Sequence, residues 1–247
     1  MQGISIIIPA YNHAHTLGRC FDCIANQTLK PAEVIVVDDG STDNFAKVME
    51  EIILTPVYEA LNIKVVRQEN RGAAAARNRG LAESRGEYVI FWDADTVAKP
   101  KMLEKMLAAL GANPSASYAY CQFKFGWTKM NSHNFDAEKL KRNNYIDTTS
   151  LIRRADYLEC FSAKGGPAFG WDESLRRFQD WDLWLTMLEQ NKTGVFVPEV
   201  LYKKITRGRQ GYSHWFPKFF YKLLWKTRAV QEFEAAREII LKKHGLS

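Results

Sequence analysis

The chain has 247 residues, of which 46% are hydrophobic and 25% charged, and its formal net charge is +6 at pH 7. It is long enough to bury a sizeable core, and its four scattered cysteines exclude a scaffold held together by disulfides. No apolar run reaches the roughly 18 residues of a membrane-spanning helix, and the N-terminus lacks the features of a signal peptide. We therefore expect a compact cytoplasmic protein.

Short β-branched runs alternate with helical segments in the first half of the chain. Strands are predicted at residues 4 to 8, 34 to 37, 63 to 67 and 88 to 92, and helices near 16 to 26, 45 to 59, 73 to 84 and 101 to 110. This order predicts an α/β fold with a mostly parallel, doubly wound sheet and helices on both faces. Residues 121 to 144 show no clear periodicity, and we interpret them as a loop that shapes an acceptor site.

Three of the predicted strands end in polar loops. Residues 9 to 12 follow the first strand, residues 38 to 41 follow the second, and Asp93-Ala94-Asp95 follows the fourth. In open α/β sheets ligands bind outside the carboxyl ends of the strands, so these loops should meet at one cleft. Because Mg2+ is usually held by one or two carboxylates together with substrate phosphates, the pattern predicts a site for a metal and a diphosphate. A solvated turn is the alternative for Asp93-Ala94-Asp95.

The basicity of the chain belongs to one segment near its C-terminus. Residues 201 to 228 contain eight Lys or Arg and no Asp or Glu. From Pro217 onward, Lys218, Lys222 and Lys226 recur on one helical face among aromatic and leucine residues. We expect a C-terminal amphipathic helical extension over residues 206–247, with peripheral membrane contact through residues 212–228. In the alternative, the aromatic side chains pack on the core and the lysines face water.

Five motifs, in this order, resemble those of the inverting GT-A glycosyltransferases of family 2. They are Ser5 to Asn12, Val36 to Asp43, Asn70-Arg71-Gly72 with Ala76 to Gly80, Asp93-Ala94-Asp95, and Phe169 to Glu173 leading to Gln179 to Trp184. The resemblance covers most of residues 3 to about 205. It implies a GT-A domain over residues 1–205, with a nucleotide-binding half (1–100) and an acceptor half (101–205).

The resemblance also implies roles for individual residues. Nucleotide binding falls to Pro9, Ala10, Tyr11, Asp39, Arg71, Arg77 and Asp93. Asp95, with Asp93 as a second ligand, would hold Mn2+ or Mg2+. Asp180 lies where the family has its catalytic base, beside Gln179 where the family usually has Glu. Trp171, Asp172 and Glu173 are assigned to the acceptor or the donor sugar.

Structural roles are the alternatives for several of these residues. Tyr11 could be a turn residue, and Asp39 a cap or part of an Asx-turn. A role in the turn competes equally for Asp172 and Glu173. Asp182 is a rival base, which we interpret as a capping or orienting group. For His214 we favour a surface or packing role. Contact with the diphosphate or the metal is the alternative.

The expected activity is metal-dependent, inverting transfer of a sugar from a nucleoside diphosphate sugar, with UDP favoured, to a hydroxyl of a glycan or lipid-linked acceptor. Such enzymes serve cell-envelope polysaccharide biosynthesis, at the inner face of the membrane if the C-terminal segment binds lipid. One alternative is a sugar nucleotidylyltransferase, which needs a Gly-rich loop that residues 9 to 12 lack. The other is an inactive GT-A-like scaffold at the membrane surface. Nucleic acid is not expected as a partner.

Overall fold

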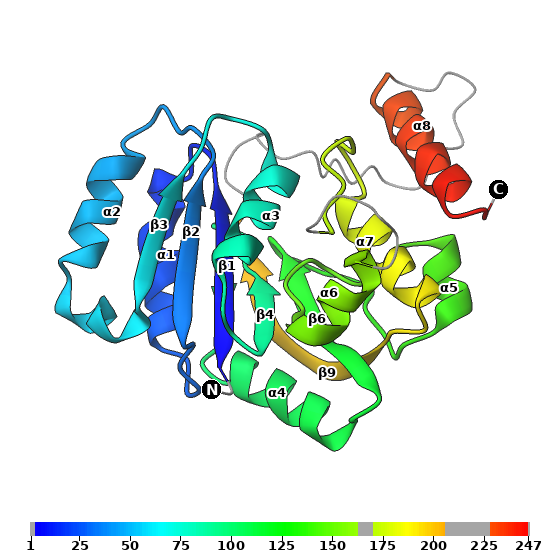
Figure 1. Ribbon diagram of the computed structural model, residues 1–247, viewed down its shortest axis with the longest axis horizontal. Coiled ribbons are helices and arrows are strands. Elements are labelled where there is room, and N and C mark those ends of the chain that lie inside the picture. The colour runs from blue at the N-terminus through cyan, green and yellow to red at the C-terminus, as the bar shows by residue number, and fades with distance from the viewer. Residues whose placement is uncertain (1–2, 163–169, 206–227, 247) are drawn as a thin grey trace.

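The computed structural model describes residues 3–162, 170–205 and 228–246 (Figure 1). The strands are β1 (Ile4–Ala10), β2 (Glu33–Asp38), β3 (Ile63–Arg67), β4 (Tyr88–Phe91), β5 (Thr96–Ala98), β6 (Ala116–Phe125), β7 (Thr128–Lys129), β8 (Leu151–Arg153) and β9 (Thr193–Lys204). The helices are α1 (Ala14–Ala25), α2 (Phe45–Ile53), α3 (Ala73–Glu83), α4 (Met102–Ala112), α5 (Ala137–Arg142), α6 (Arg154–Ser162), α7 (Gln179–Glu189) and α8 (Arg228–Lys243), with a 3-10 helix at Pro56–Leu61.

One sheet runs through the molecule in the order β3-β2-β1-β4-β8-β6-β9-β5, and β7 pairs with β6. Strands β1, β2, β3 and β4 are parallel to one another. Strand β8 runs antiparallel to both β4 and β6, and β9 is parallel to β6. The strands β1, β2, β4, β6 and β9 therefore all end at one edge of the sheet, and the polar loops meet there as expected.

Alternate side chains of β1 enter two separate cores. Ile6 and Ile8 belong to a cluster that includes residues of α1, α2 and α4, whereas Ile7 belongs to one that includes residues of α3 and α7. This division follows from the two-residue period of a strand. Helix α3 approaches the sheet at Gly80, where a Cβ atom would lie 2.3 Å from Cγ2 of Ile7. Any larger residue would push α3 away from β1.

Two parts of the sequence-based assignment are wrong. The helix predicted over 45 to 59 ends at Ile53, and Pro56 begins a 3-10 helix, because proline cannot continue an α-helix. Residues 121 to 144 are not a loop throughout: they contain the end of β6, then β7 and α5. Residues 116–123 of β6 are all buried, so the polar alternation that reveals a half-exposed strand is missing.

The second half of the sheet is mixed. Among the strand pairs of the described residues, four are parallel and four are antiparallel. The parallel strands β1 to β4 all lie within residues 1–100, and the nucleotide-binding role expected of this half stays a prediction. Short strands such as β5 and β8, with three residues each, are too brief for their direction to be predicted from periodicity.

The C-terminal helix α8 lies beside α7 (Figure 1). Phe233 packs edge-on against Phe178, with ring centroids 4.9 Å apart, and Val230 and Ile240 are fully buried. Residues 212–227, which make up all but the last residue of the predicted membrane contact and include His214, lie outside the described residues, as does Phe169. Of the helices that the structure describes, none combines the length and apolar character needed to span a bilayer. The boundary at residue 205 between the GT-A domain and the C-terminal extension stays a prediction.

Candidate active site

Asp39 holds together the loops that follow β2 and β3. Its buried carboxylate accepts hydrogen bonds from Nε2 of Gln68 (2.8 Å) and from the backbone N–H groups of Arg71 (2.9 Å) and Gly72 (2.8 Å). The Asx-type contact belongs instead to Asp38, whose Oδ1 accepts from the N–H of Ser41 at 2.8 Å. Since a carboxylate offers about four acceptor positions, Asp39 keeps capacity for one further N–H donor.

The loop after β1 is ordered by Asn12. This residue has a positive φ of 56°, and its Oδ1 accepts from the N–H groups of Thr42 (2.8 Å) and Asp43 (3.2 Å). Tyr11 is left 46% exposed at the edge of the sheet. Pro9 and Ala10 are the last residues of β1, and the carbonyl of Ala10 accepts from the N–H of Asp39 at 2.8 Å. These two residues therefore fix the backbone that leads to Tyr11.

Asn78 on α3 anchors the loop before α7. Its amide exchanges two hydrogen bonds with the backbone of Trp171, at 2.9 and 3.0 Å, and donates to Oε1 of Glu173 at 3.0 Å. The other carboxylate oxygen of Glu173 pairs with Arg71 at 2.8 Å. Trp171 is fully buried, and its ring lies 4.6 Å from the guanidinium of Arg77. Within this arrangement Trp171 packs in the core, and Glu173 ties its loop to α3.

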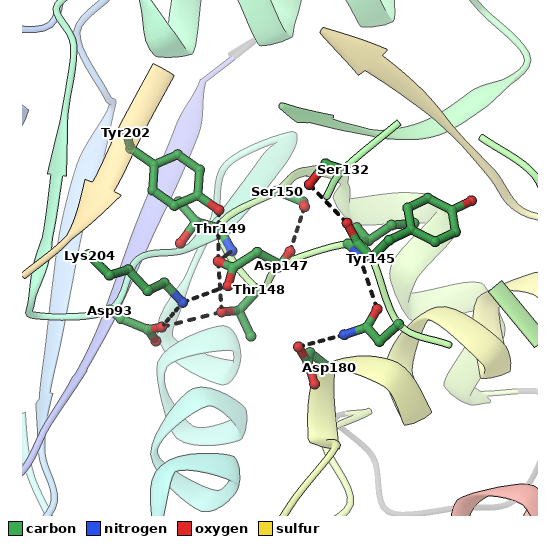
Figure 2. A network of polar contacts seen from close by, with 12 residues as sticks. Asp93, Ser132, Tyr145, Asp147, Thr148, Thr149, Ser150, Asp180, Tyr202 and Lys204 are labelled. Carbon is green, nitrogen blue, oxygen red and sulfur yellow. Dashed lines mark hydrogen bonds and ion pairs between the residues drawn. The ribbon is translucent and has the colours of Figure 1, made fainter. Parts of the chain in front are cut away.

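Four charged side chains form a balanced network at the carboxyl edge of the sheet, and Figure 2 shows three of them, Asp93, Asp147 and Lys204. Asp93 pairs with Arg77 at 3.0 Å and with Lys204 at 2.8 Å, and Lys204 also pairs with Asp147 at 2.7 Å. Burial alone would raise the pKa of Asp93, but the charges of Lys204 and Arg77 hold it well below its usual range. Burial would lower the pKa of Lys204, but Asp147 and Asp93 raise it. Two cations thus neutralise two carboxylates.

Asp95 lies outside this balanced network. Its Oδ1 is buried and has no hydrogen-bond partner among the described residues. Burial and the charge of Asp93 raise the pKa of Asp95 to about 6. A buried carboxylate oxygen without a partner fits one ligand of Mn2+ or Mg2+, which prefer oxygen donors and complete their shells with phosphates and water. Both oxygens of Asp93 are engaged, so Asp95 is the better fit of the two predicted metal ligands.

Asp180 lies in the first turn of α7, and each oxygen of its carboxylate accepts one hydrogen bond. Oδ2 accepts from Nδ2 of Asn144 at 2.7 Å, and Oδ1 accepts from the N–H of Trp181 at 2.9 Å. Burial and the charge of Asp147 raise the pKa of Asp180 to about 6. The neighbouring Gln179 accepts a hydrogen bond from Arg77 at 3.1 Å, so this neutral residue adds no second negative charge beside Asp180.

Two of the acidic side chains near α7 face the C-terminal helix. Asp182 pairs with Lys243 at 2.7 Å and with Nε2 of His244 at 2.9 Å. Asp172 accepts from Ser174 and pairs with Lys243 at 2.7 Å. These contacts hold Asp172 and Asp182 against the end of the C-terminal helix. The predicted contact of Asp172 with a sugar and the orienting role of Asp182 stay predictions.

Several residues of the site were missed by the sequence analysis. Lys204 and Tyr202 were counted within the basic, aromatic segment, and Asn144, Asp147 and Thr148 were not singled out. Tyr202 donates to Asp147 at 2.8 Å and Thr148 to Asp93 at 3.3 Å (Figure 2). The available signal was the alternation Tyr202-x-Lys204 at the end of an apolar run, which puts both side chains on one face of a strand.

Removal of the Lys204 charge should destabilise the fold. We expect Lys204→Met to lower the free energy of unfolding by about 3–5 kcal/mol, because Asp147 loses its cation and Asp93 keeps only Arg77. Urea unfolding at pH 7 measures the effect. Lys64→Met, which removes a surface pair with Glu83, is the matched control and should cost less than about 1 kcal/mol. Equal losses in the two variants would contradict the buried network.

Comparison with solved structures defines the class of the fold. TarS of S. aureus in complex with UDP-GlcNAc superposes with a TM-score of 0.70 and 19% identity, covering 99% of this chain and 73% of that one. A mannosyltransferase of Pyrobaculum calidifontis in complex with GDP-Man and Mn2+ has a TM-score of 0.64 and 20% identity, covering 85% and 59%. The protein has the GT-A fold expected from its sequence.

Sequence comparison establishes the family. The model of glycosyl transferase family 2 matches residues 5–177, and the chain therefore belongs to glycosyltransferase family 2. A cholesterol galactosyltransferase of Borreliella burgdorferi is 41% identical over 101 residues, which is 41% of this chain. The match spans 27% of that relative, so it covers only a minor part of the longer protein.

Proposed function

We propose that the protein transfers a sugar from a nucleoside diphosphate sugar to a hydroxyl group, with inversion at the anomeric carbon and dependence on a divalent metal. The proposal is carried by one observation. Asp95 and Asp180 are the two site carboxylates with raised pKa, and neither has a cation of its own within the described ion pairs. A carboxylate that lacks a cation is available to bind an incoming one or to accept a proton.

The donor base is assigned to the loops after β1 and β2. Asp39 keeps capacity for an N–H donor after its three hydrogen bonds, and Tyr11 presents an exposed ring on which a base can stack. Pro9 and Ala10 set the position of that ring. The relatives with solved structures carry UDP-GlcNAc in one case and GDP-Man in the other, and we favour a UDP-linked donor.

Asp95 is assigned to the metal. A divalent ion, when bound, neutralises charge on the departing diphosphate. Arg77 and Lys204 hold Asp93 in place, and so keep the backbone that leads to Asp95 fixed at the end of β4. Arg71, in the loop after β3, forms a solvent-exposed pair with Glu173 and can turn toward a nucleotide at little energetic cost.

Asp180 is assigned to proton removal. Its carboxylate would take the proton of the acceptor hydroxyl as the oxygen attacks the anomeric carbon, a step worth roughly 100 to 10,000-fold. Asn144 and the N–H of Trp181 fix the orientation of this carboxylate. A single base and a single displacement give inversion. The acceptor is a glycan or a lipid-linked sugar in this proposal.

Binding calorimetry with UDP, dTDP and GDP, each with and without Mn2+, tests the donor assignment. We expect one nucleotide to bind tightly and only when Mn2+ is present. Binding that is equally strong without the metal would contradict metal dependence. Absence of binding by all three nucleotides would contradict the donor site and would favour a GT-A-like protein without turnover.

The activity should depend on pH through Asp180. Because a base must be deprotonated, we expect kcat/KM to level off above a pH of about 6 and to fall tenfold per pH unit below it. A carboxyl with its ordinary pKa of 3.8 would keep the activity constant down to about pH 4. Initial rates of transfer between pH 4.5 and 8, at saturating Mn2+, distinguish the two profiles.

A further inference from the structure

A short hairpin projects from the edge of the sheet beside the active site. Strands β6 and β7 are joined by the two residues Gly126 and Trp127, and Phe125 pairs with Thr128. Gly126 has a φ of +58°, which suits the first central position of such a turn, and its N–H donates to the carbonyl of Lys204 at 3.1 Å. The turn is therefore held on β9, and the Trp127 side chain at its tip is 98% exposed.

Three lysines lie in one row across the strands that support this hairpin. Lys124 of β6 pairs in register with Lys129 of β7 on one side and with Lys203 of β9 on the other. Residues in register share a face of the sheet, so the three ammonium groups are neighbours. All three are exposed, and none forms an ion pair with a carboxylate of the described residues. We call Lys124, Lys129 and Lys203 the lysine row.

Fold stability does not explain the lysine row or Trp127. Like charges directly opposite one another destabilise a sheet, so the row weakens the pairing of β6 with its neighbours. A ring that is 98% exposed contributes almost no burial to the fold. Both features become favourable only against a partner that supplies negative charge to the row and an apolar environment to the ring.

The hairpin and the lysine row stand at the same edge of the sheet as the catalytic groups. Lys203 and Lys204 are consecutive in β9, so their side chains point to opposite faces. Lys204 enters the buried network with Asp93, whereas Lys203 joins the exposed row. A surface that contacts the row therefore lies next to the carboxyl edge of the sheet, on which the donor loops converge.

We propose that Trp127 and the lysine row dock the protein on a bilayer that carries anionic phospholipid. A tryptophan ring is favoured at the boundary between headgroups and acyl chains, and lysines are attracted to anionic headgroups. Among the described residues, none covers the Trp127 ring, as suits insertion into a lipid surface. Docking there would turn the carboxyl edge of the sheet toward the membrane. Asp95 lies at this edge, at the end of β4, and Asp180 lies in the first turn of α7. The proposal concerns binding and does not depend on the transfer reaction.

Sedimentation of the full chain with vesicles tests the proposal in the absence of donor. Wild type should bind vesicles of phosphatidylcholine with 30 mol% phosphatidylglycerol as a test mixture, and bind pure phosphatidylcholine far more weakly. The triple variant K124Q/K129Q/K203Q should lose affinity on the order of 100-fold, at roughly fivefold for each lysine. Trp127→Ser should lose roughly tenfold. The fluorescence of Trp127, taken as the difference between wild type and Trp127→Ser, should shift to the blue on binding.

A second triple variant tests whether vesicle binding depends on the position of the lysines or only on the net charge of the protein. K47Q/K101Q/K242Q removes three exposed lysines elsewhere in the described residues, so its net charge equals that of the first triple variant. It should bind vesicles within a few-fold of wild type, and thermal melts should show that both triple variants fold. Equal loss in the two triple variants would overturn the proposal, as would unchanged binding by K124Q/K129Q/K203Q. Hairpin-dependent binding of heparin or RNA without vesicle binding would also overturn it.

Discussion

Asp180→Asn should reduce kcat for sugar transfer by roughly 100 to 10,000-fold, because the acceptor hydroxyl loses its proton acceptor. Asparagine keeps the shape of the side chain and an oxygen for the N–H of Trp181, so the start of α7 should be preserved. The affinity for the nucleotide in the presence of Mn2+ should stay within a few-fold of wild type, since Asp180 lies outside the loops assigned to the donor. Initial rates and calorimetry on the same preparation measure both quantities.

Asp182→Asn is the matched control for this prediction. Asp182 lies two residues away in the same helix, but its carboxylate faces Lys243 and His244 of the C-terminal region. Its substitution should lower stability by weakening the contact between α7 and the end of α8, and should leave kcat within a few-fold of wild type. A collapse of kcat in Asp182→Asn, with activity retained in Asp180→Asn, would reverse the assignment of the base.

Asp95→Asn should weaken the binding of Mn2+ in the presence of UDP on the order of 100-fold or more. The substitution replaces the one buried carboxylate oxygen of the site that lacks a partner among the described residues with a neutral amide. Electron paramagnetic resonance of free Mn2+ measures the affinity directly, without any need for turnover. Nucleotide binding should become as weak as that of wild type without metal.

Asp156→Asn is the matched control, because it also replaces one carboxylate by an amide, at a position far from Asp95 in the sequence. Asp156 on α6 pairs with Lys192 at 3.0 Å and should leave Mn2+ binding unchanged. If Asp95→Asn bound Mn2+ like wild type, Asp95 would not be a metal ligand. The metal would then have to be held by Asp93, at the expense of its pairs with Arg77 and Lys204.

Local sequence patterns were sufficient for the first half of the fold and for the residues at the strand ends. The continuous β-branched runs predicted β1, β2 and β4 within about two residues, because strands buried on both faces leave that pattern in the chain. Asp39, Asp93 and Asp95 each follow such a run directly, so parallel pairing alone brings them to one edge. The same patterns carried the resemblance to family 2, which the comparisons confirm.

The second half of the chain shows where local patterns stop being informative. The mixed pairing of β5, β6, β8 and β9 depends on contacts between segments far apart in sequence. The register of β9 against β6 decides that Lys203 joins the exposed row while Lys204 reaches Asp93 and Asp147. From composition alone both lysines belonged to one basic segment.

The sequence by itself determined the family, the parallel half of the sheet and the order in which the acidic motifs reach its edge, since these follow from local runs and strand direction. Only the tertiary structure decided which acids are neutralised and which are left without a cation. Asp93 lies beside Lys204, 111 residues away, whereas Asp95 and Asp180 are half-buried and form no ion pair with the described residues. Burial and neighbouring charge set a pKa, and both depend on packing between distant segments.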